Sequence, residues 1–208
     1  MKRKYPRTKH VMWSPGKTSD DKMHDDLKFF EGKEIVITEK MDGENTTLSN
    51  EYIHARSLDS ADHPSRHWVK GLWGKLKHDI PEDWKICGEN LYATHSLHYT
   101  NLPSYFMVFS IWDENGVCLS IDDTLLICKY LGLEHAPILW RGIYNEEFVK
   151  NFKVNTEIQE GYVIRLADSF TFEEFDTSVA KFVRKGHVTT EDHWMYKKIV
   201  PNELKPKE

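Results

Sequence analysis

The chain has 208 residues, a formal net charge of −5 at pH 7, and a composition that is 39% hydrophobic, 29% charged and 12% aromatic. These values are typical of a soluble globular protein and exclude the disordered and fibrous classes. No apolar run approaches the roughly 20 residues of a membrane span and the first ten residues lack an apolar signal core, so we expect a cytoplasmic protein with no membrane partner. The negative charge argues against a protein-wide field that steers polyanions, and any nucleic-acid affinity must come from local basic clusters.

The N-terminal segment, residues 1–30, is basic at first and then polar. We expect it to contain a helix that ends at Phe30 and is capped by Thr18, Ser19 or Asp20. The basic start of the segment either helps to hold nucleic acid or is a frayed tail.

The stretch ITEKMDGENTTLS, residues 37–49, places Lys40 between an apolar run and an Asp-Gly turn. The alternation of Ile35 and Ile37 and a second β-rich run over residues 46–48 predict two strands. We expect the turn to join them as a hairpin, since Asp-Gly tolerates positive φ. The hairpin would place Lys40 at an edge or in a cleft.

Apolar periodicity predicts the remaining elements. Residues 62–80 carry Trp68, Leu72 and Leu76 at steps of four, the stripe of an amphipathic helix. We expect one α+β domain of antiparallel strands and flanking helices over residues 1–208, because no repeat or linker divides the series. The other predicted elements are, in chain order, strands over 84–92 and 104–120, the second with a hairpin turn at 114–116, a helix between Ser120 and Gly132, a short helix over 145–152, strands over 160–166 and 178–185, and a helix over 189–198 within a short helical tail, 186–208.

Five charged residues stand inside strand-like, half-apolar stretches: Lys40, Arg56, Glu89, Glu160 and Lys181. Strand interiors avoid unpaired charges, because burying a charge is costly unless partners are present. We therefore expect these residues to share a cleft.

The segments around these charges resemble, in order and spacing, the motifs of the covalent nucleotidyltransferase family of polynucleotide ligases and capping enzymes. Within that family, the stretches EKMDGENTTL and KFVRKGHVTTEDHW are most similar to ATP-dependent RNA ligases of bacterial and phage type. The resemblance covers about residues 35 to 195 and implies an ATP-grasp-like ligase architecture without a C-terminal OB domain. It is carried by KMDG at 40–43, CGE at 87–89, FSIWD at 109–113, EGYV at 160–163 and AKFV at 180–183, with Arg56 between the first two.

The resemblance implies that Lys40 is the nucleophile that takes AMP from ATP as a covalent lysyl-AMP. The attacking lysine must be neutral and an ordinary lysine has a pKa near ~10.4, so a nearby cation has to lower that pKa. Lys181 is expected to be this cation and to hold the α-phosphate. Glu160 and Asp42 are the expected ligands of Mg²⁺ or Mn²⁺, since hard carboxylate oxygens suit such ions.

The resemblance also implies residues that hold the nucleotide. Glu89 would accept hydrogen bonds from ribose hydroxyls, and Arg56 would pair with a phosphate through its fixed fork of donors. Phe109 would lie flat on the adenine, with Trp112 as the competing choice.

Further pocket residues are expected around Lys40 and after the last motif. Glu39, Asp42 and Gly43 would shape the pocket, Gly43 because the backbone must pass close to a ligand. Either Lys185 or Arg184 would supply the second cation of the last motif.

By resemblance, the chain is expected to be an ATP-dependent RNA ligase that passes AMP from Lys40 to a 5′-phosphate RNA end and seals that end to a 3′-hydroxyl. The RNA could be a nicked duplex, and an accessory RNA-binding or repair protein is a further expected partner. Three alternatives stay open: a minimal DNA nick ligase, a capping-type guanylyltransferase that uses GTP, and an inactive protein of the same fold that binds nucleic-acid ends. The short stretch after Lys185 argues against enzymes that require an OB domain.

Overall fold

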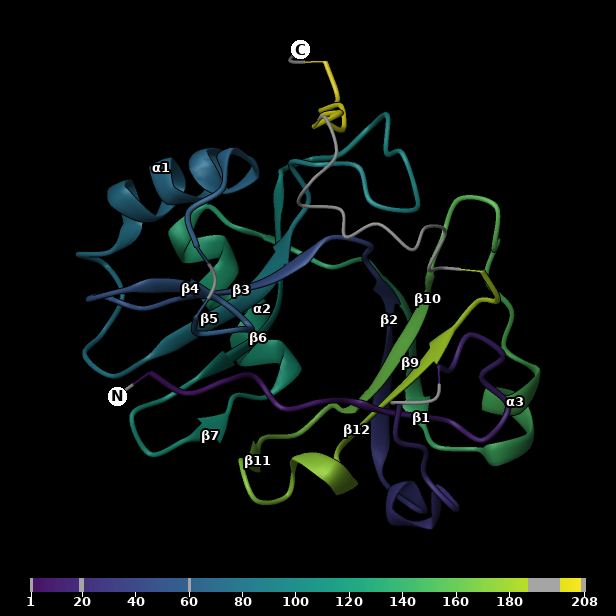
Figure 1. Cartoon of the computed structure of the whole chain (residues 1–208). Coiled ribbons are helices and arrows are strands. Elements are labelled where there is room, and N and C mark those ends of the chain that lie inside the picture. The colour runs from purple at the N-terminus through teal and green to yellow at the C-terminus, as the bar shows by residue number, and fades with distance from the viewer. Residues whose placement is uncertain (1, 19–20, 60, 187–198, 207–208) are drawn as a thin grey trace.

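The computed structural model describes residues 2–18, 21–59, 61–186 and 199–206. Its strands form two sheets that lie on either side of the middle of the molecule (Figure 1). The first sheet has, in spatial order, β1 (Lys9–His10), β12 (Val179–Val183), β10 (Gly161–Leu166), β2 (Glu34–Lys40) and β9 (Ile138–Ile143). The second has β11 (Phe170–Thr171), β7 (Val117–Cys118), β6 (Phe106–Trp112), β5 (Lys85–Asn90), β3 (Glu44–Leu48) and β4 (Ile53–Ala55), and β8 (Glu134–His135) pairs with β6.

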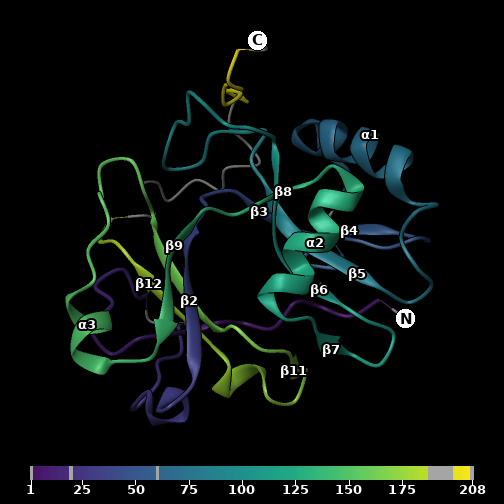
Figure 2. The same cartoon turned by 180° about the vertical axis from the view of Figure 1, so that it is seen from behind.

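Neighbouring strands of the described chain are antiparallel, except that β1 is parallel to β12 and β8 is parallel to β6. Helices α1 (His67–Leu76) and α2 (Ile121–Leu131) lie on the outer face of the second sheet, as the view from behind shows (Figure 2). The remaining helical elements are α3 (Glu146–Asn151) and 3-10 turns at Lys28–Phe30, Pro64–Arg66 and Phe175–Thr177. The prediction of an α+β fold built mainly on antiparallel strands is thus confirmed.

The second sheet is buried on both faces. Between the two sheets, Trp112 of β6 packs against the rings of Phe170 and Phe175, in one apolar cluster with Val179 of β12. On the other face, Val69 of α1 and Cys128 of α2 belong to a second cluster with residues of β3, β5 and β6. The two sheets are therefore fixed to each other by apolar packing, which is the dominant favourable term in folding.

Several predicted elements are confirmed. Helix α1 packs its predicted stripe onto the second sheet. Helix α2 begins at Ser120, whose Oγ accepts the N–H of Asp123 at 3.1 Å, and ends at Gly132 with a left-handed φ of 65°. The predicted strands over 84–92, 104–120, 160–166 and 178–185 are also present, whereas β9 was not predicted. In the part of the chain that the structure describes, no helix has both the length and the apolar character that crossing a bilayer requires.

The predicted hairpin around Asp42 and Gly43 is wrong. Strand β2 belongs to the first sheet and β3 pairs with β5 in the second, so the residues between them carry the chain from one sheet to the other. Position 43 requires glycine because there is no room for a side chain, and not because of a turn conformation. A Cβ at this position would lie 2.5 Å from the carbonyl oxygen of Asn90. Lys40 therefore ends a central strand at the crossing between the sheets.

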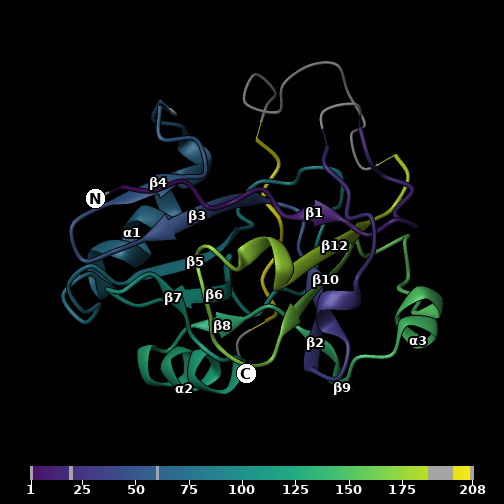
Figure 3. The ribbon, with the colours of Figure 1, turned by 90° about the horizontal axis from the view of Figure 1, so that it is seen from below.

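The N-terminal segment is part of the fold and not a frayed tail. From below, residues before β1 are seen to cross from the second sheet to the first (Figure 3). The ring of Tyr5 packs edge-on against Phe109 and Phe175, with centroid distances of 5.1 and 5.3 Å. This packing anchors the segment beside the space between the sheets.

Two helix predictions differ from the structure. The helix expected to end at Phe30 is reduced to a 3-10 turn, because the N–H of His24 and the carbonyl of Lys22 bond to His10 of β1 and not along a helix. The helix over 189–198 lies outside the described residues. The described part of the tail, 199–206, is not helical and forms bridges with the loop after β5.

Gly161 offers a test of how tightly the first sheet is packed. A Cβ at Gly161 would lie 2.0 Å from the carbonyl oxygen of Phe182 on β12. We expect Gly161→Ala to lower the free energy of unfolding by about 2 kcal/mol, because the clash is with backbone that cannot turn away. The matched control is Gly71→Ala in α1, where nothing lies within 4 Å of the added carbon and the variant should gain about 0.5–1 kcal/mol. Urea unfolding measures the free energy of unfolding of both variants. A Gly161→Ala variant as stable as Gly71→Ala would contradict the close packing of β10 against β12.

Candidate active site

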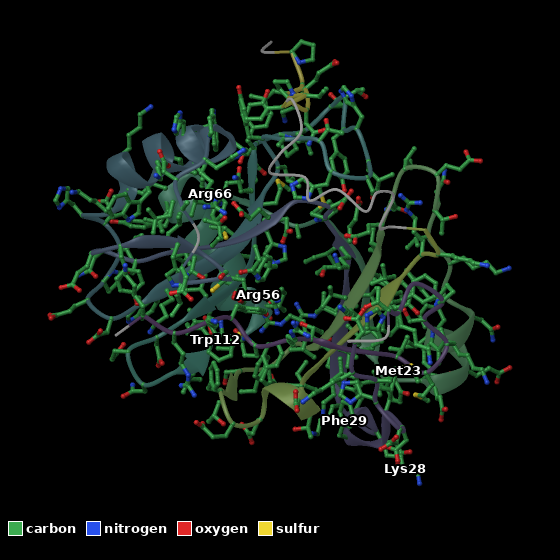
Figure 4. All side chains as sticks on the ribbon, viewed as in Figure 1. Met23, Lys28, Phe29, Arg56, Arg66 and Trp112 are labelled. Carbon is green, nitrogen blue, oxygen red and sulfur yellow. The ribbon has the colours of Figure 1, made fainter. Side chains whose placement is uncertain are left out.

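A cavity of about 460 Å³ lies between the two sheets at the end of β2. Figure 4 places Arg56 near the centre of the molecule, between the sheets. Side chains from both sheets meet on the wall, so charges from separate strands face one space. The predicted site residues on this wall are Glu39, Lys40, Arg56, Glu89, Phe109 and Lys181.

Strand register places Glu160 beside Lys40. Gly161, the first residue of β10, pairs with Lys40, the last residue of β2, and Glu160 directly precedes that pair. Lys40 Nζ donates a hydrogen bond to Glu160 Oε2, and the Glu160 side chain is buried. Each partner requires the other, because removing one leaves an unpaired charge in poorly solvated surroundings.

The charges around Lys40 keep it protonated. Burial lowers the pKa of Lys40, but the carboxylates of Glu160, Glu89 and Asp42 outweigh burial and raise this pKa above its ordinary value. The expectation that Lys181 leaves Lys40 with a lowered pKa is therefore wrong for this arrangement of residues. It is Lys181 whose pKa is lowered, first by burial and further by the positive charge of Lys40.

Glu89 is a carboxyl group that titrates near neutral pH. Burial raises the pKa of Glu89 to about 8, Lys40 opposes the shift, and Glu160 and Asp42 add to it. The N–H of Gly43 also donates a hydrogen bond to this carboxyl group. Over much of the neutral range Glu89 therefore carries a proton and can donate as well as accept hydrogen bonds.

Asp21 is a cavity residue that the sequence reasoning missed. Its carboxylate lies 3.5 Å from Lys181 Nζ and 3.4 Å from His10 Nε2, and it accepts hydrogen bonds from the N–H and hydroxyl of Thr18. Burial acts to raise the pKa of Asp21, but Thr18 and Lys181 outweigh it and lower the pKa to about 2. Nothing in the polar run SPGKTSDD marks Asp21, because its partner Lys181 comes from the far end of the chain.

Asp42 holds a loop and is not part of the cavity wall. Its Oδ2 accepts hydrogen bonds from the N–H and hydroxyl of Ser96 and from the N–H of Leu97, each at 2.8 Å. The N–H of Asp42 donates to the Tyr99 hydroxyl at 3.0 Å. These contacts leave at most Oδ1 for a cation, so Asp42 as a metal ligand stays a prediction.

The two aromatic candidates for the adenine contact lie in different surroundings. Phe109 is half-buried and lines the cavity. Trp112 is buried between aromatic rings, with Phe170 and Phe172 at centroid distances of 5.7 Å. Its indole N–H donates to Ser110 Oγ at 3.1 Å. The geometry therefore favours Phe109, because it lines the cavity and Trp112 does not.

The two candidate cations of the last motif also differ. Arg184 Nη2 donates to Ser96 Oγ at 3.1 Å, and its N–H donates to the carbonyl of Glu160 at 2.8 Å. Arg184 thus bonds to the loop that contains Ser96 and to the backbone of Glu160, the partner of Lys40. Lys185 is exposed and lies outside the set of described residues that line the cavity, so its role stays a prediction.

A second arginine faces the cavity beside Arg56. Arg7 of the N-terminal segment and Arg56 both line the wall. Burial lowers the pKa of Arg56, and the positive charge of Arg7 lowers it further, whereas Asp21 opposes the shift. Two like charges near one space make that part of the cavity suitable for an anion such as a phosphate chain.

The carboxylates of this site could hold a divalent cation only together with the phosphates of a bound nucleotide. Within residues 2–18, 21–59, 61–186 and 199–206, no cluster of three or more His, Cys, Asp or Glu side chains could bind a metal alone. Mg²⁺ typically binds through one or two carboxylates together with phosphates and waters. Glu160 offers such a carboxylate next to Lys40, and the phosphates would have to supply the rest.

A lysine lies among carboxylates at the crossing of the two sheets, with arginines across the cavity, and such a charged space suits a phosphate-bearing ligand. The chain belongs to the RNA ligase family, since the model of that family, described as RNA ligase, matches residues 33–183. The match includes Lys40, Arg56, Glu89 and Glu160 as well as Lys181. No curated protein matches the chain in sequence.

Solved structures share the fold at low sequence identity. An archaeal ATP-dependent RNA ligase is 14% identical with a TM-score of 0.54, over 88% of this chain and 48% of that one. A protein of Aquifex aeolicus assigned as an ATP-dependent DNA ligase is 22% identical with a TM-score of 0.56, over 87% and 50%. A mutant RNA ligase of Naegleria gruberi with ATP and Mn is 14% identical with a TM-score of 0.51, over 88% and 60%. The chain thus spans about half the length of the first two.

The raised pKa of Glu89 predicts a pH dependence of stability. On folding this pKa rises from 4.5 to about 8, so the folded chain binds the proton more tightly than the unfolded chain. The contribution of Glu89 to stability therefore falls as the pH rises from about 5 to about 8. Glu89→Gln cannot ionise, and its stability relative to the wild type should increase across this window.

Urea unfolding at several pH values measures this difference. The control is Glu157→Gln, which makes the same substitution at an exposed position away from the cavity. A stability difference from the wild type that changes with pH no more in Glu89→Gln than in Glu157→Gln would show that Glu89 ionises normally in the folded chain.

Proposed function

We propose that this chain is an ATP-dependent RNA ligase that carries AMP on Lys40 as a covalent intermediate. The observation that supports the proposal is the position of Lys40 on a cavity wall, hydrogen-bonded to Glu160 and faced by Lys181 and Arg56. Membership of the RNA ligase family supports the choice of RNA as the substrate.

In the first step, Lys40 Nζ attacks the α-phosphorus of ATP. The N–P bond forms as the bond to the pyrophosphate oxygen breaks, and pyrophosphate leaves. Lys181 and Arg56 bind the phosphates, which compete with Asp21 for Lys181. Phe109 stacks on the adenine, and Glu89 binds the ribose hydroxyls. Glu39, which also lines the cavity, accepts a hydrogen bond from Gln159 Nε2 at 2.9 Å.

Lys40 has to lose its proton before it can attack. The carboxylates that keep it charged, Glu160 foremost, must therefore be offset when the nucleotide binds. A bound Mg²⁺ or Mn²⁺ at Glu160 would supply positive charge to these carboxylates and to the phosphates. Two side chains add further positive charge, Lys181 from the same sheet as Lys40 and Arg56 from the opposite side of the cavity.

In the later steps AMP leaves Lys40. A 5′-phosphate oxygen of RNA attacks the lysyl-AMP phosphorus and forms an adenylated end. A 3′-hydroxyl then attacks the 5′-phosphorus, forms the phosphodiester bond and expels AMP. The same cations stabilise the oxygens on which negative charge develops in each step. An accessory RNA-binding or repair protein stays a prediction.

Covalent labelling tests the proposal. Purified protein is incubated with α-labelled ATP or GTP and Mg²⁺, and label that survives denaturation is measured. We expect label from ATP alone, loss of at least about 100-fold in Lys40→Ala because no other group can replace the nucleophile, and loss of label when a chelator removes the metal. Lys129→Ala, at an exposed position of α2, is the matched control and should label like the wild type.

Discharge of the label separates the alternatives. Release by 5′-phosphorylated RNA supports the RNA ligase, whereas release by a nicked DNA duplex alone identifies a DNA ligase. Label from GTP indicates a guanylyltransferase. No label on folded protein that carries no AMP beforehand would contradict the proposal and favour a protein that only binds nucleic-acid ends.

A further inference from the structure

We propose that Asn202 is a positioning residue for Lys40, and that it acts through the loop of residues 91–105 and Asp42. The inference rests on the proposed function, because Lys40 is taken as the nucleophile. Asn202 belongs to the C-terminal segment, which lies against the loop after β5 in the views of Figures 1 and 2.

Asn202 is fully enclosed by the loop, with 1% of its surface exposed. Its Nδ2 donates to the carbonyl of Leu91 at 2.7 Å and lies 3.4 Å from that of Ala93, and its Oδ1 accepts from Thr94 Oγ1 at 3.0 Å and the N–H of Tyr99 at 2.9 Å. The amide thus uses both its donors and its acceptor. Truncating it would leave these buried loop groups unpaired, which is costly.

The backbone of the C-terminal segment follows the same loop. The N–H of Asn202 donates to the carbonyl of Tyr92 at 2.9 Å, and the Tyr105 hydroxyl donates to the carbonyl of Asn202 at 2.9 Å. Bridges at Pro201 and Leu204 flank these contacts. The loop therefore takes its shape from the segment around Asn202.

The other side of this loop holds Asp42. Ser96 and Leu97 supply the three hydrogen bonds to Asp42 Oδ2, and the Tyr99 hydroxyl accepts the N–H of Asp42. Tyr99 is bonded to Asn202 through its N–H and to Asp42 through its hydroxyl, so one residue connects the two.

Asp42 lies two residues after Lys40, where the chain leaves the first sheet. The strand fixes the backbone of Lys40 on one side only, because β2 ends at this residue. Beyond it, Asp42 and its loop contacts determine the direction of the chain. A displacement of about 1 Å at a reacting group can cost on the order of 100-fold in rate. A residue that fixes Asp42 therefore affects the attack of Lys40 without touching the nucleotide.

The experiment compares Asn202→Ala with Asn145→Ala. Asn145 caps α3, and its side chain accepts a hydrogen bond from the N–H of Phe148 at 2.8 Å. Asn145→Ala therefore also removes an asparagine hydrogen bond, but on a helix that has no contact with Asp42. Two quantities are measured on folded full-length protein: hydrogen exchange at the amides of Ser96 and Leu97, and the single-turnover rate of AMP attachment as a function of ATP concentration.

For Asn202→Ala we expect exchange at Ser96 and Leu97 to be about 10-fold faster, because their bonds to Asp42 open more often. The rate at saturating ATP should fall by about 10-fold, with a half-saturating ATP concentration within about 2-fold of the wild type. Phe109 belongs to β6 and Arg56 directly follows β4, so their backbones are fixed by the second sheet and not by this loop. Asn145→Ala should change neither quantity.

A third variant tests whether the effect passes through the loop. Tyr99→Phe removes the hydroxyl that contacts Asp42 but keeps the N–H bonded to Asn202. If Asn202 acts through Tyr99, the two effects on the rate of AMP attachment should not add. Tyr99→Phe should then slow the rate less when it is introduced into Asn202→Ala than when it is introduced into the wild type.

Unchanged exchange at Ser96 and Leu97 in Asn202→Ala would overturn the inference whether or not the wild type is active. An unchanged rate in Asn202→Ala, with an active wild type, would overturn it as well. A wild type that attaches no AMP is instead a failure of the proposed function, and the exchange measurement then decides whether Asn202 fixes Asp42.

Discussion

The hydrogen-bonded ion pair between Lys40 and Glu160 is the interaction on which the rest of the site depends. It joins the last residue of β2 to the residue before β10, and the strand register brings them together because Gly161, the first residue of β10, pairs with Lys40. The pair and the nearby Glu89 and Asp42 raise the pKa of Lys40 above its ordinary value. The protein thus keeps its candidate nucleophile charged and unreactive, and positive charge brought to the carboxylates is what would release it.

Segments with little regular structure complete the site around this pair. The N-terminal segment brings Asp21 to Lys181 and Arg7 to the cavity wall, and it is anchored by the packing of Tyr5 between the sheets. At the other end of the chain, Asn202 fixes the loop that holds Asp42. The sheets place the charges, and these segments determine which partners the charges have before any nucleotide binds.

Local patterns predicted much of the fold. The apolar stripe of α1 and the Ser120 cap of α2 depend only on residues close together in the sequence, and both predictions are confirmed. The hairpin after Lys40 was wrong because Asp-Gly describes only a local turn preference, whereas the pairing of β3 with β5 is decided by distant residues. Charges in strands predicted five residues that share a cleft. Lys40, Arg56, Glu89 and Lys181 line the cavity, whereas Glu160 is buried and bonded to Lys40 without lining the wall. Asp21 and Asn202 carried no such signal, since polar residues in loops are common and their partners lie far along the chain.

The titration of the Lys40 ammonium group tests the central claim most directly, namely that the surrounding carboxylates keep the candidate nucleophile charged. Lysine side chains labelled with ¹³C and ¹⁵N can be followed by NMR against pH, and a Lys40→Arg spectrum assigns the signal. We predict a pKa of Lys40 above its ordinary value in the wild type and a lower one in Glu160→Gln, because the first carboxylate partner is then neutral. A pKa below the ordinary value in the wild type, or one that Glu160→Gln leaves unchanged, would contradict the account.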